Sequence, residues 1–159
     1  MRIILLISIS AISLIILLLF LLFYPAGVII SPTEDNNSSG YLCIKGNCFQ
    51  VQLAETELQR EKGLMHVKEL DKDKGMLFIF DKEGIYPFWM KNTLIPLDMI
   101  WIDSNYKIVF ISQNVQPCRS LICPSIIPNA KANYVLEINA GILQNLGIKI
   151  GDMAEFKIN

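Results

Sequence analysis

The chain opens with a long apolar run and continues in shorter, mixed patterns. Residues 3–23 carry no charge, and three serines are their only polar side chains. A helix of these 21 residues is long enough to cross a hydrocarbon core of about 30 Å. Arg2 precedes the run and the first charge after it is Glu34. Because positive charge favours the cytoplasmic side, we expect residues 1–30 to be an anchor with a cytoplasmic N-terminus.

A cleaved signal peptide is the alternative interpretation of this run. Such peptides have a shorter apolar core, of about 7–15 residues, followed by a small-x-small cleavage site. Here the core is longer and no A-x-A pattern follows it, so we favour an uncleaved anchor. The next segment, "SPTEDNNSSG" at 31–40, is polar and aperiodic, which is typical of a flexible linker. We expect residues 41–159 to form one extracytoplasmic domain.

The hydrophobic pattern of that domain predicts mostly strands. Residues 49–53 alternate between apolar and polar side chains, whereas residues 75–80 are apolar without alternation. Further strands are expected at 87–91, 97–102, 107–112, 134–138 and 154–158. Two short helices are expected, one at 57–62 after a Thr56–Gln59 capping box and one at 140–146 capped by Asn139. The order lacks βαβ alternation, so we predict an α+β domain with a mainly antiparallel sheet that closes into a small barrel.

One segment of the domain has no clear period. Residues 114–133 contain three prolines, and a loop of this length without secondary structure is uncommon in a compact domain. We therefore expect a functional or covering loop at this position.

Charge narrows the range of partners. The domain has 13 Lys/Arg and 13 Asp/Glu residues and no basic stripe. Nucleic-acid-binding domains usually carry a basic patch or stripe, so the balance argues against a nucleic-acid partner.

The four cysteines form two close pairs in the sequence, Cys43 with Cys48 and Cys118 with Cys123. Four cysteines allow three connectivities, and the spacing does not choose among them. A zinc site built from all four is the alternative. The predicted extracytoplasmic location favours disulfides, because that compartment is oxidising.

Two isolated carboxylates lie within apolar strand patterns. Asp98 follows a turn after Lys91 and Asn92, and Glu137 lies in the 134–138 strand. Buried carboxylates are usually satisfied by nearby donors, so we expect Asp98 to bond to the 91–96 turn and Glu137 to pair with Lys91 or Arg60. If the two shared a cleft, they would resemble the catalytic pair of a glycoside hydrolase.

An aromatic side chain next to polar ones is the best candidate for ligand binding. Trp89 and Lys91 alternate with Phe88 and Met90, so one of the two pairs is expected to face outward. Trp89, Lys91 and Asn92 could then stack on and orient a sugar or another flat ligand.

Metal binding and the commoner kinds of catalysis have weaker support. Met65 and His66, with Met76 and Met90 elsewhere, are residue types that suit Cu(I), although methionine is common core filler. The chain has no G-x-S-x-G elbow and no Walker A or G-x-G-x-x-G loop. We therefore predict no cofactor and no metal site.

Four stretches carry a family resemblance: "GLM" at 63–65, "GMLFIF" at 75–80, "FWMKNTLIPLDMIWID" at 88–103 and "YVLEINAGILQNLGIKIGD" at 134–152. They resemble the family called domain of unknown function 192, from about residue 51 to the C-terminus. The "PCRSLICP" segment is similar to the version in some members. The resemblance implies a small, mostly β domain that is often exported or membrane-anchored, and it supplies no activity.

Together these patterns lead to two functional hypotheses. The first is a non-enzymatic, membrane-tethered binding or envelope-assembly module, with Trp89, Lys91 and Asn92 at its recognition surface and an envelope glycan or protein as its partner. The second is a cell-envelope hydrolase acting on glycan through Asp98 and Glu137. The second hypothesis requires both carboxyl groups to face one cleft.

Overall fold

The computed structural model describes residues 38–158. Among these residues no helix is both long and apolar enough to cross a bilayer. The predicted anchor, 1–30, lies outside the described residues, as does most of the predicted linker, 31–40. The first strand begins at Ser39, so the last two linker residues belong to the folded domain.

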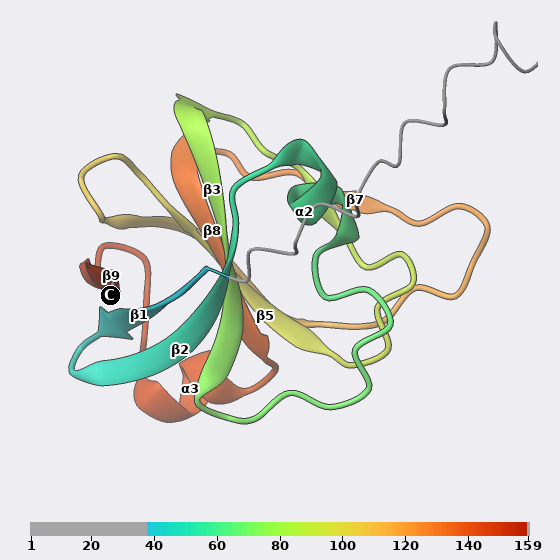
Figure 1. Ribbon diagram of the computed structural model, residues 1–159, viewed down its shortest axis with the longest axis horizontal. Helices are drawn as coiled ribbons and strands as arrows, with labels where there is room; N and C mark the ends of the chain where they lie inside the picture. The colour runs from blue at the N-terminus through green and yellow to red at the C-terminus, as the bar shows by residue number, and fades with distance from the viewer. Residues whose placement is uncertain (1–37, 159) are drawn as a thin grey trace, which may run out of the picture. The chain divides into compact units, whose positions relative to one another are not determined.

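The described residues form a seven-stranded sheet, a two-stranded ribbon and two short helices (Figure 1). The strands are β1 (Ser39–Ile44), β2 (Asn47–Ala54), β3 (Lys74–Gly84), β4 (Phe88–Trp89), β5 (Leu97–Ile102), β6 (Ile108–Val115), β7 (Ser125–Ile126), β8 (Ala132–Asn139) and β9 (Ala154–Ile158). The helices are α2 (Glu57–Lys62) and α3 (Ile142–Leu146). The order in the large sheet is β6-β5-β8-β3-β2-β1-β9, and β4 pairs with β7. All pairs are antiparallel except β2 with β3, which confirms the predicted mainly antiparallel α+β class.

The sheet curls into a half-barrel, so the predicted barrel is confirmed only in part (Figure 1). The edge strands, β6 and β9, meet at one end. There Ile108 N–H donates to the carbonyl of Asp152, and Ala154 N–H donates to that of Tyr106. Beyond this contact β6 and β9 are not hydrogen-bonded as neighbours in the sheet. The residues just before β6 therefore bring the two edges of the sheet together at one point, without a continuous ladder of hydrogen bonds.

The two faces of the sheet carry separate apolar clusters, and β5 contributes to both. All six residues of β5 are buried. Ile100 and Ile102 pack in one cluster with β1, β2 and α3, whereas Met99 and Trp101 pack in the other with Leu64. This alternation confirms the predicted two-sided burial of the strand. A strand covered on both faces gives the sheet a rigid centre, and the site described below is built on it.

One helix, α2, has the predicted bounds and cap, whereas α3 differs from its prediction in both its start and its cap. In α2 the predicted capping box is present: the Thr56 hydroxyl accepts from Gln59 N–H, and the Gln59 side chain accepts from Thr56 N–H. The other helix, α3, begins at Ile142 rather than at 140, and Gly141 occupies its N-cap. Asn139 does not cap it, because the Asn139 amide donates instead to the carbonyls of Leu70 and Asp71.

The predicted structureless loop at 114–133 is partly ordered by pairing. Within it, β7 forms a short ribbon with β4, in which Ile126 faces Phe88 and Ser125 faces Trp89. Cys118 N–H also donates to the carbonyl of Met90, at 3.1 Å. The segment that carries β7 extends away from the sheet at the right of Figure 1. The prediction missed this pairing because a two-residue strand has too few positions to show a period.

Candidate binding cleft

Trp89 is the most exposed aromatic side chain of the segment that links β3 to β5. Its neighbours Phe88 and Met90 turn inward: the Phe88 ring meets the Phe78 ring edge-on at 4.8 Å, and Met90 is buried. Trp89 points the other way and is 43% exposed. One of the two pairs therefore faces outward, as alternation requires, and it is the pair with Trp89.

Lys91 extends over Trp89. Its ammonium nitrogen lies 5.2 Å from the centroid of the indole ring, a cation–π geometry. The backbone of Lys91 forms an isolated bridge with Cys118, so the disulfide-bonded segment holds it from the other side. The two predicted binding residues therefore lie together, on a backbone supported by β7 and its loop.

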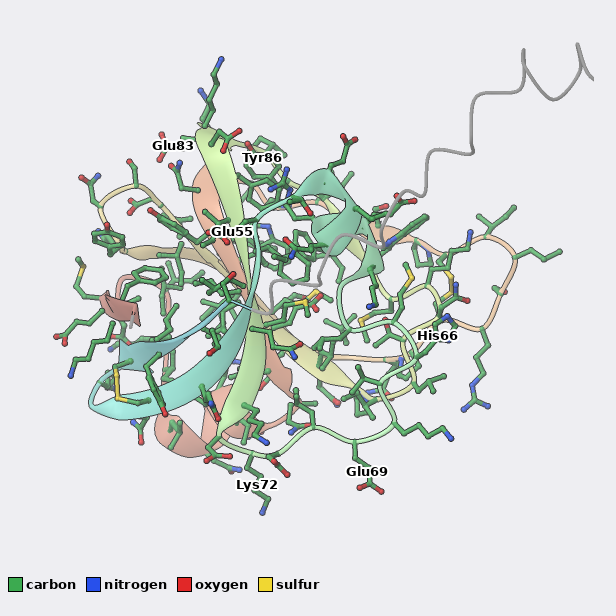
Figure 2. The ribbon with its side chains drawn as sticks, viewed as in Figure 1. Glu55, His66, Glu69, Lys72, Glu83 and Tyr86 are labelled. Atoms are coloured by element: carbon green, nitrogen blue, oxygen red, sulfur yellow. A yellow bond between two sulfur atoms is a disulfide. The ribbon has the colours of Figure 1, made fainter. Side chains whose placement is uncertain are left out.

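Asn92 lies beside His66 at the same rim. Both have positive φ, 58° and 63°, and His66 N–H donates to the carbonyl of Asn92 at 2.9 Å. Left-handed backbone is uncommon outside glycine, although Asn and His adopt it more readily than most residues. Figure 2 shows His66 in the segment that follows α2. One backbone hydrogen bond thus links two left-handed residues, His66 and Asn92, at the edge of the cleft.

These residues enclose a cleft of about 540 Å³, called here the Trp89 cleft. It is lined by Leu58, Glu61, Lys62, Met65, His66, Trp89, Lys91 and Asn92. The volume is within the usual range for small-molecule sites, which is about 300–1,000 Å³.

Beneath the Trp89 cleft lies a small cavity of about 30 Å³ with Glu137 in its wall. The cavity and the cleft share Met65, Trp89 and Lys91 as lining residues, so the two adjoin. Glu137 is on β8 and is 5% exposed. On its two sides it is paired in register with Met76 of β3 and Met99 of β5. Both neighbours are apolar, and burial among such groups raises the pKa of Glu137 to about 8.

Thr93 is the second buried polar side chain at this cavity. It is 5% exposed and lines the cavity together with Glu137. Neither the Thr93 hydroxyl nor the Glu137 carboxyl has a hydrogen bond to any residue in the range 38–158. Their oxygens are not sealed from solvent, because in this range the one fully buried side-chain N or O atom without a partner is Asn133 Oδ1. The two side chains are therefore free to bond to a group that enters the cavity.

The predicted ion pair of Glu137 with Lys91 or Arg60 is wrong. Lys91 lies over Trp89, as described. Arg60 donates to the carbonyls of Glu55 and Ile79, and its guanidinium lies 5.2 Å from the centroid of the Phe80 ring. Both cations therefore have other partners, and burial alone accounts for the raised pKa of Glu137.

Asp98 is on the strand next to Glu137, but its side chain points away from this site. In β5 it is paired with Ile138, whereas Glu137 is paired with Met99, so the two carboxyl groups project from opposite faces. Asp98 is fully buried and accepts from Asn114 N–H at 2.8 Å and from Leu143 N–H at 3.0 Å. Its expected bonds to the 91–96 turn are absent from these contacts. The structure therefore does not bring the proposed catalytic pair together.

The cysteines form two disulfides, Cys43–Cys48 and Cys118–Cys123. The first links directly opposite residues of the β1–β2 hairpin, and the second closes a turn of the β7 loop. The four-cysteine zinc alternative is thereby overturned. Within residues 38–158 no cluster of three or more His, Cys, Asp or Glu side chains could hold a metal ion. Of the methionines considered for copper, Met90 is buried in the core, whereas Met65 lines the cleft with His66.

A second cleft, of about 430 Å³, lies between β2 and the 64–75 segment. Gln50, Gln52, Glu69 and Lys74 are among its lining residues, and it has no aromatic side chain. Glu69 is labelled in Figure 2 on the loop before β3. None of the buried polar side chains of the described chain lines it. The Trp89 cleft is therefore the stronger candidate site.

Thr93 and Met65 are site residues that the sequence analysis did not select. Thr93 follows Lys91 and Asn92, so its place in a polar run was the available signal. Met65 comes from the loop after α2, and its contact with the cleft depends on how that loop packs, which no local pattern specifies.

Comparison with known proteins gives relatives but no activity. The UPF0127 protein of Thermococcus kodakarensis is 29% identical to this chain over 109 residues, and that of Pyrococcus horikoshii is 29% identical over 108 residues. Each match covers 65% of this chain. The match covers 84% of the Pyrococcus protein but only 62% of the Thermococcus one, so the chain spans about three fifths of the latter.

Two crystal structures share the fold and part of the sequence. One is a candidate transcription regulator from Sinorhizobium meliloti, with 36% identity, a TM-score of 0.66 and coverage of 75% of this chain and 92% of that one. The other is a protein of unknown function from Novosphingobium aromaticivorans, with 33% identity, a TM-score of 0.66 and coverage of 74% and 83%. Residues 41–156 match the model of the family DUF192 (Uncharacterized ACR, COG1430), and the chain therefore belongs to that family.

Proposed function

We propose that this protein is a non-enzymatic binding module of the cell envelope, and that the Trp89 cleft is its recognition site for a glycan. One observation carries the proposal. Glu137 and Thr93, which have no hydrogen bond to any residue in the range 38–158, line a small cavity that adjoins the cleft beside an exposed Trp89. A ligand with polar groups of its own could form hydrogen bonds to both side chains there.

The form of the cleft supports a ring-shaped ligand. Trp89 offers a flat apolar surface at the rim, while Lys91 and Asn92 add hydrogen-bond donors beside it. Sugars combine an apolar ring face with hydroxyl groups around the edge, so they match both kinds of surface. Pockets of this type typically use a few polar groups to fix the orientation of a ligand that is held mainly by apolar contact.

Two features support a location outside the cytoplasm. Both cysteine pairs form disulfides, which persist mainly in oxidising compartments. Residues 3–23 also have the length and composition of a membrane span. A domain tethered in this way would meet envelope glycans at high local concentration.

The hydrolase alternative has less support. The pair of carboxylates that it requires, Asp98 and Glu137, lies on opposite faces of the sheet. Asp98 also uses both oxygens to accept backbone hydrogen bonds. No observation therefore favours glycan cleavage by this pair.

A binding assay on the full chain in detergent micelles tests the proposal. Wild-type protein is titrated by calorimetry with soluble fragments of envelope glycans, and the same titration is made with Trp89→Ala and Tyr41→Ala. We expect the Trp89→Ala change to weaken binding at least tenfold, because stacking on the indole is lost. Tyr41 is similarly exposed but lies on β1 outside the cleft, so Tyr41→Ala should bind like wild type.

Two results would count against the proposal. The first is the absence of binding of every glycan by the wild-type chain. The second is equal affinity of the wild-type and Trp89→Ala proteins, which would place any binding elsewhere.

A further inference from the structure

The cavity below the Trp89 cleft has room for only a small part of a ligand. Its volume of about 30 Å³ corresponds to about one or two water-sized groups. Glu137 and Thr93 both line it, and neither side chain is hydrogen-bonded to another described residue. A single hydroxyl group of a larger ligand would fit this space and could bond to both side chains at once.

The charges around the cavity are unequal. Its lining residues include two cations whose partners are carbonyls or aromatic rings, Arg60 and Lys91, and one other acidic residue, Glu61. A third cation, Lys62, has a partner of its own and is not counted in this balance. Burial raises the pKa of Glu137 to about 8, so at neutral pH that side chain is mostly the uncharged acid. The site as a whole is then electropositive, which favours a ligand that carries negative charge.

We infer that the Trp89 cleft takes an acidic sugar, a pyranose with a carboxylate, whose ring stacks on Trp89 while one hydroxyl enters the cavity between Glu137 and Thr93. The carboxylate lies next to Lys91, whose ammonium group is already held over the Trp89 ring. This inference rests on the proposed function and adds the class of sugar and the way it is held. An ammonium group and a carboxylate form a stronger, charge-assisted hydrogen bond than two neutral groups do.

The arrangement couples binding to a proton. The uncharged Glu137 can donate a hydrogen bond, whereas the ionised form cannot and would repel an anionic ligand. Around Glu137, α2 contributes Arg60, Glu61 and Lys62, the segment between β4 and β5 contributes Lys91 and Thr93, and the neighbouring strands contribute the neutral Met76 and Met99. Affinity for an acidic sugar should therefore fall as pH rises through about 8.

The test compares methyl glucuronide with methyl glucoside as probes. Calorimetric titrations are made on the full chain in micelles at pH 7 and pH 9. At pH 7 we expect the glucuronide to bind at least tenfold more tightly than the glucoside. Because the protonated fraction of Glu137 changes about tenfold between these pH values, glucuronide affinity should fall about tenfold at pH 9.

Two variants separate the parts of the inference. Glu137→Gln cannot ionise, so its glucuronide affinity should be the same at pH 7 and pH 9. Lys91→Met removes the cation that meets the carboxylate, so it should abolish the preference for the glucuronide over the glucoside. Circular dichroism at both pH values checks that each variant is folded.

Each outcome decides between the inference and the function on which it rests. Equal affinity of the wild type for the two probes, or an equal fall with pH in Glu137→Gln, overturns the inference and leaves the binding function standing. If wild type binds neither these probes nor any other glycan, the proposed function fails and the inference fails with it.

Discussion

Asp98 and Glu137 lie on neighbouring strands, yet their carboxyl groups project from opposite faces of one sheet. Asp98 is paired with Ile138 instead of Glu137, and this difference of one residue in register is enough to separate them. One carboxylate accepts two backbone hydrogen bonds, and the other has none from residues 38–158. Their roles therefore differ: the first is structural, and the second lies at the candidate site.

Asp98→Asn should destabilise the fold. The carboxylate accepts from Asn114 N–H and Leu143 N–H, and an amide can replace only one of these acceptors. One buried N–H is then left facing a donor, which should lower the free energy of unfolding by about 2–3 kcal/mol in urea denaturation. Asp103→Asn is the matched control. Asp103 also accepts two backbone N–H groups, but in an exposed turn, so its change should cost less than about 1 kcal/mol. Equal effects of the two changes would contradict a structural role for buried Asp98.

The buried Glu137 makes stability depend on pH. Its pKa rises from an ordinary 4.5 to about 8 in the folded state, so between these values the folded chain binds a proton that the unfolded chain does not. The free energy of unfolding contributed by this group is complete below pH 4.5 and is lost as pH rises toward 8, by about 5 kcal/mol in total.

Glu137→Gln is the variant that isolates this dependence. The difference in urea-denaturation free energy between variant and wild type should grow in favour of the variant from pH 5 to pH 8 and then stay constant. Other titrating groups cancel in this difference. A constant difference over the whole range would mean that the carboxyl of Glu137 is not desolvated as its burial implies.

Gly75→Ala should be strongly destabilising through crowding. A Cβ atom at this position would lie 2.6 Å from the carbonyl oxygen of Glu137 and 2.9 Å from a methyl of Ile138. Because the first contact is with backbone, β8 must shift away, and we expect a loss of about 3 kcal/mol. Gly46→Ala is the comparison, since its added Cβ would meet nothing within 4 Å and only the positive φ of 80° opposes it, at about 1 kcal/mol. Similar melting temperatures for the two variants would show that β8 moves freely.

The two disulfides should differ in their effect on the cleft. Both close loops of the same length, with a sequence separation of 5, so their removal should cost similar stability, at most about 2 kcal/mol each. The double change Cys118→Ala and Cys123→Ala should also shift Trp89 fluorescence, because Cys118 bonds to the backbone next to Trp89. The change Cys43→Ala and Cys48→Ala should leave the emission as it is, since that pair lies in the β1–β2 hairpin. An equal emission shift in both variants would argue against a local link.

Local patterns predicted most strands of the fold. The 97–102 strand was predicted with its exact bounds and with burial on both faces, because its apolar pattern is unbroken except at Asp98. The hairpin between the first two cysteines turns at Lys45–Gly46, with positive φ at both positions. A two-residue turn with this backbone needs φ above zero twice, and Lys45 adopts it without a sequence signal.

The site was predictable only in part. Alternation required one of two pairs to face outward but did not choose between them, and the structure places Trp89 and Lys91 at one cleft with Asn92. The surroundings of Asp98 and Glu137 did not follow, because strand register decides which face each carboxyl group takes, and the loop 63–73 supplies part of the cavity wall beside Glu137. Patterns within one strand do not contain that information.

The two hydrogen bonds of Asp98 also say something about the order of folding. The five-residue helix α3 is too short to persist alone, and its N-cap, Gly141, has no side chain with which to begin the first turn. Asp98 satisfies Leu143 N–H in its place, across 45 residues of sequence. The hydrogen bond that caps this helix therefore requires β5 to be in place beside β8, so we expect α3 to be a late element of folding.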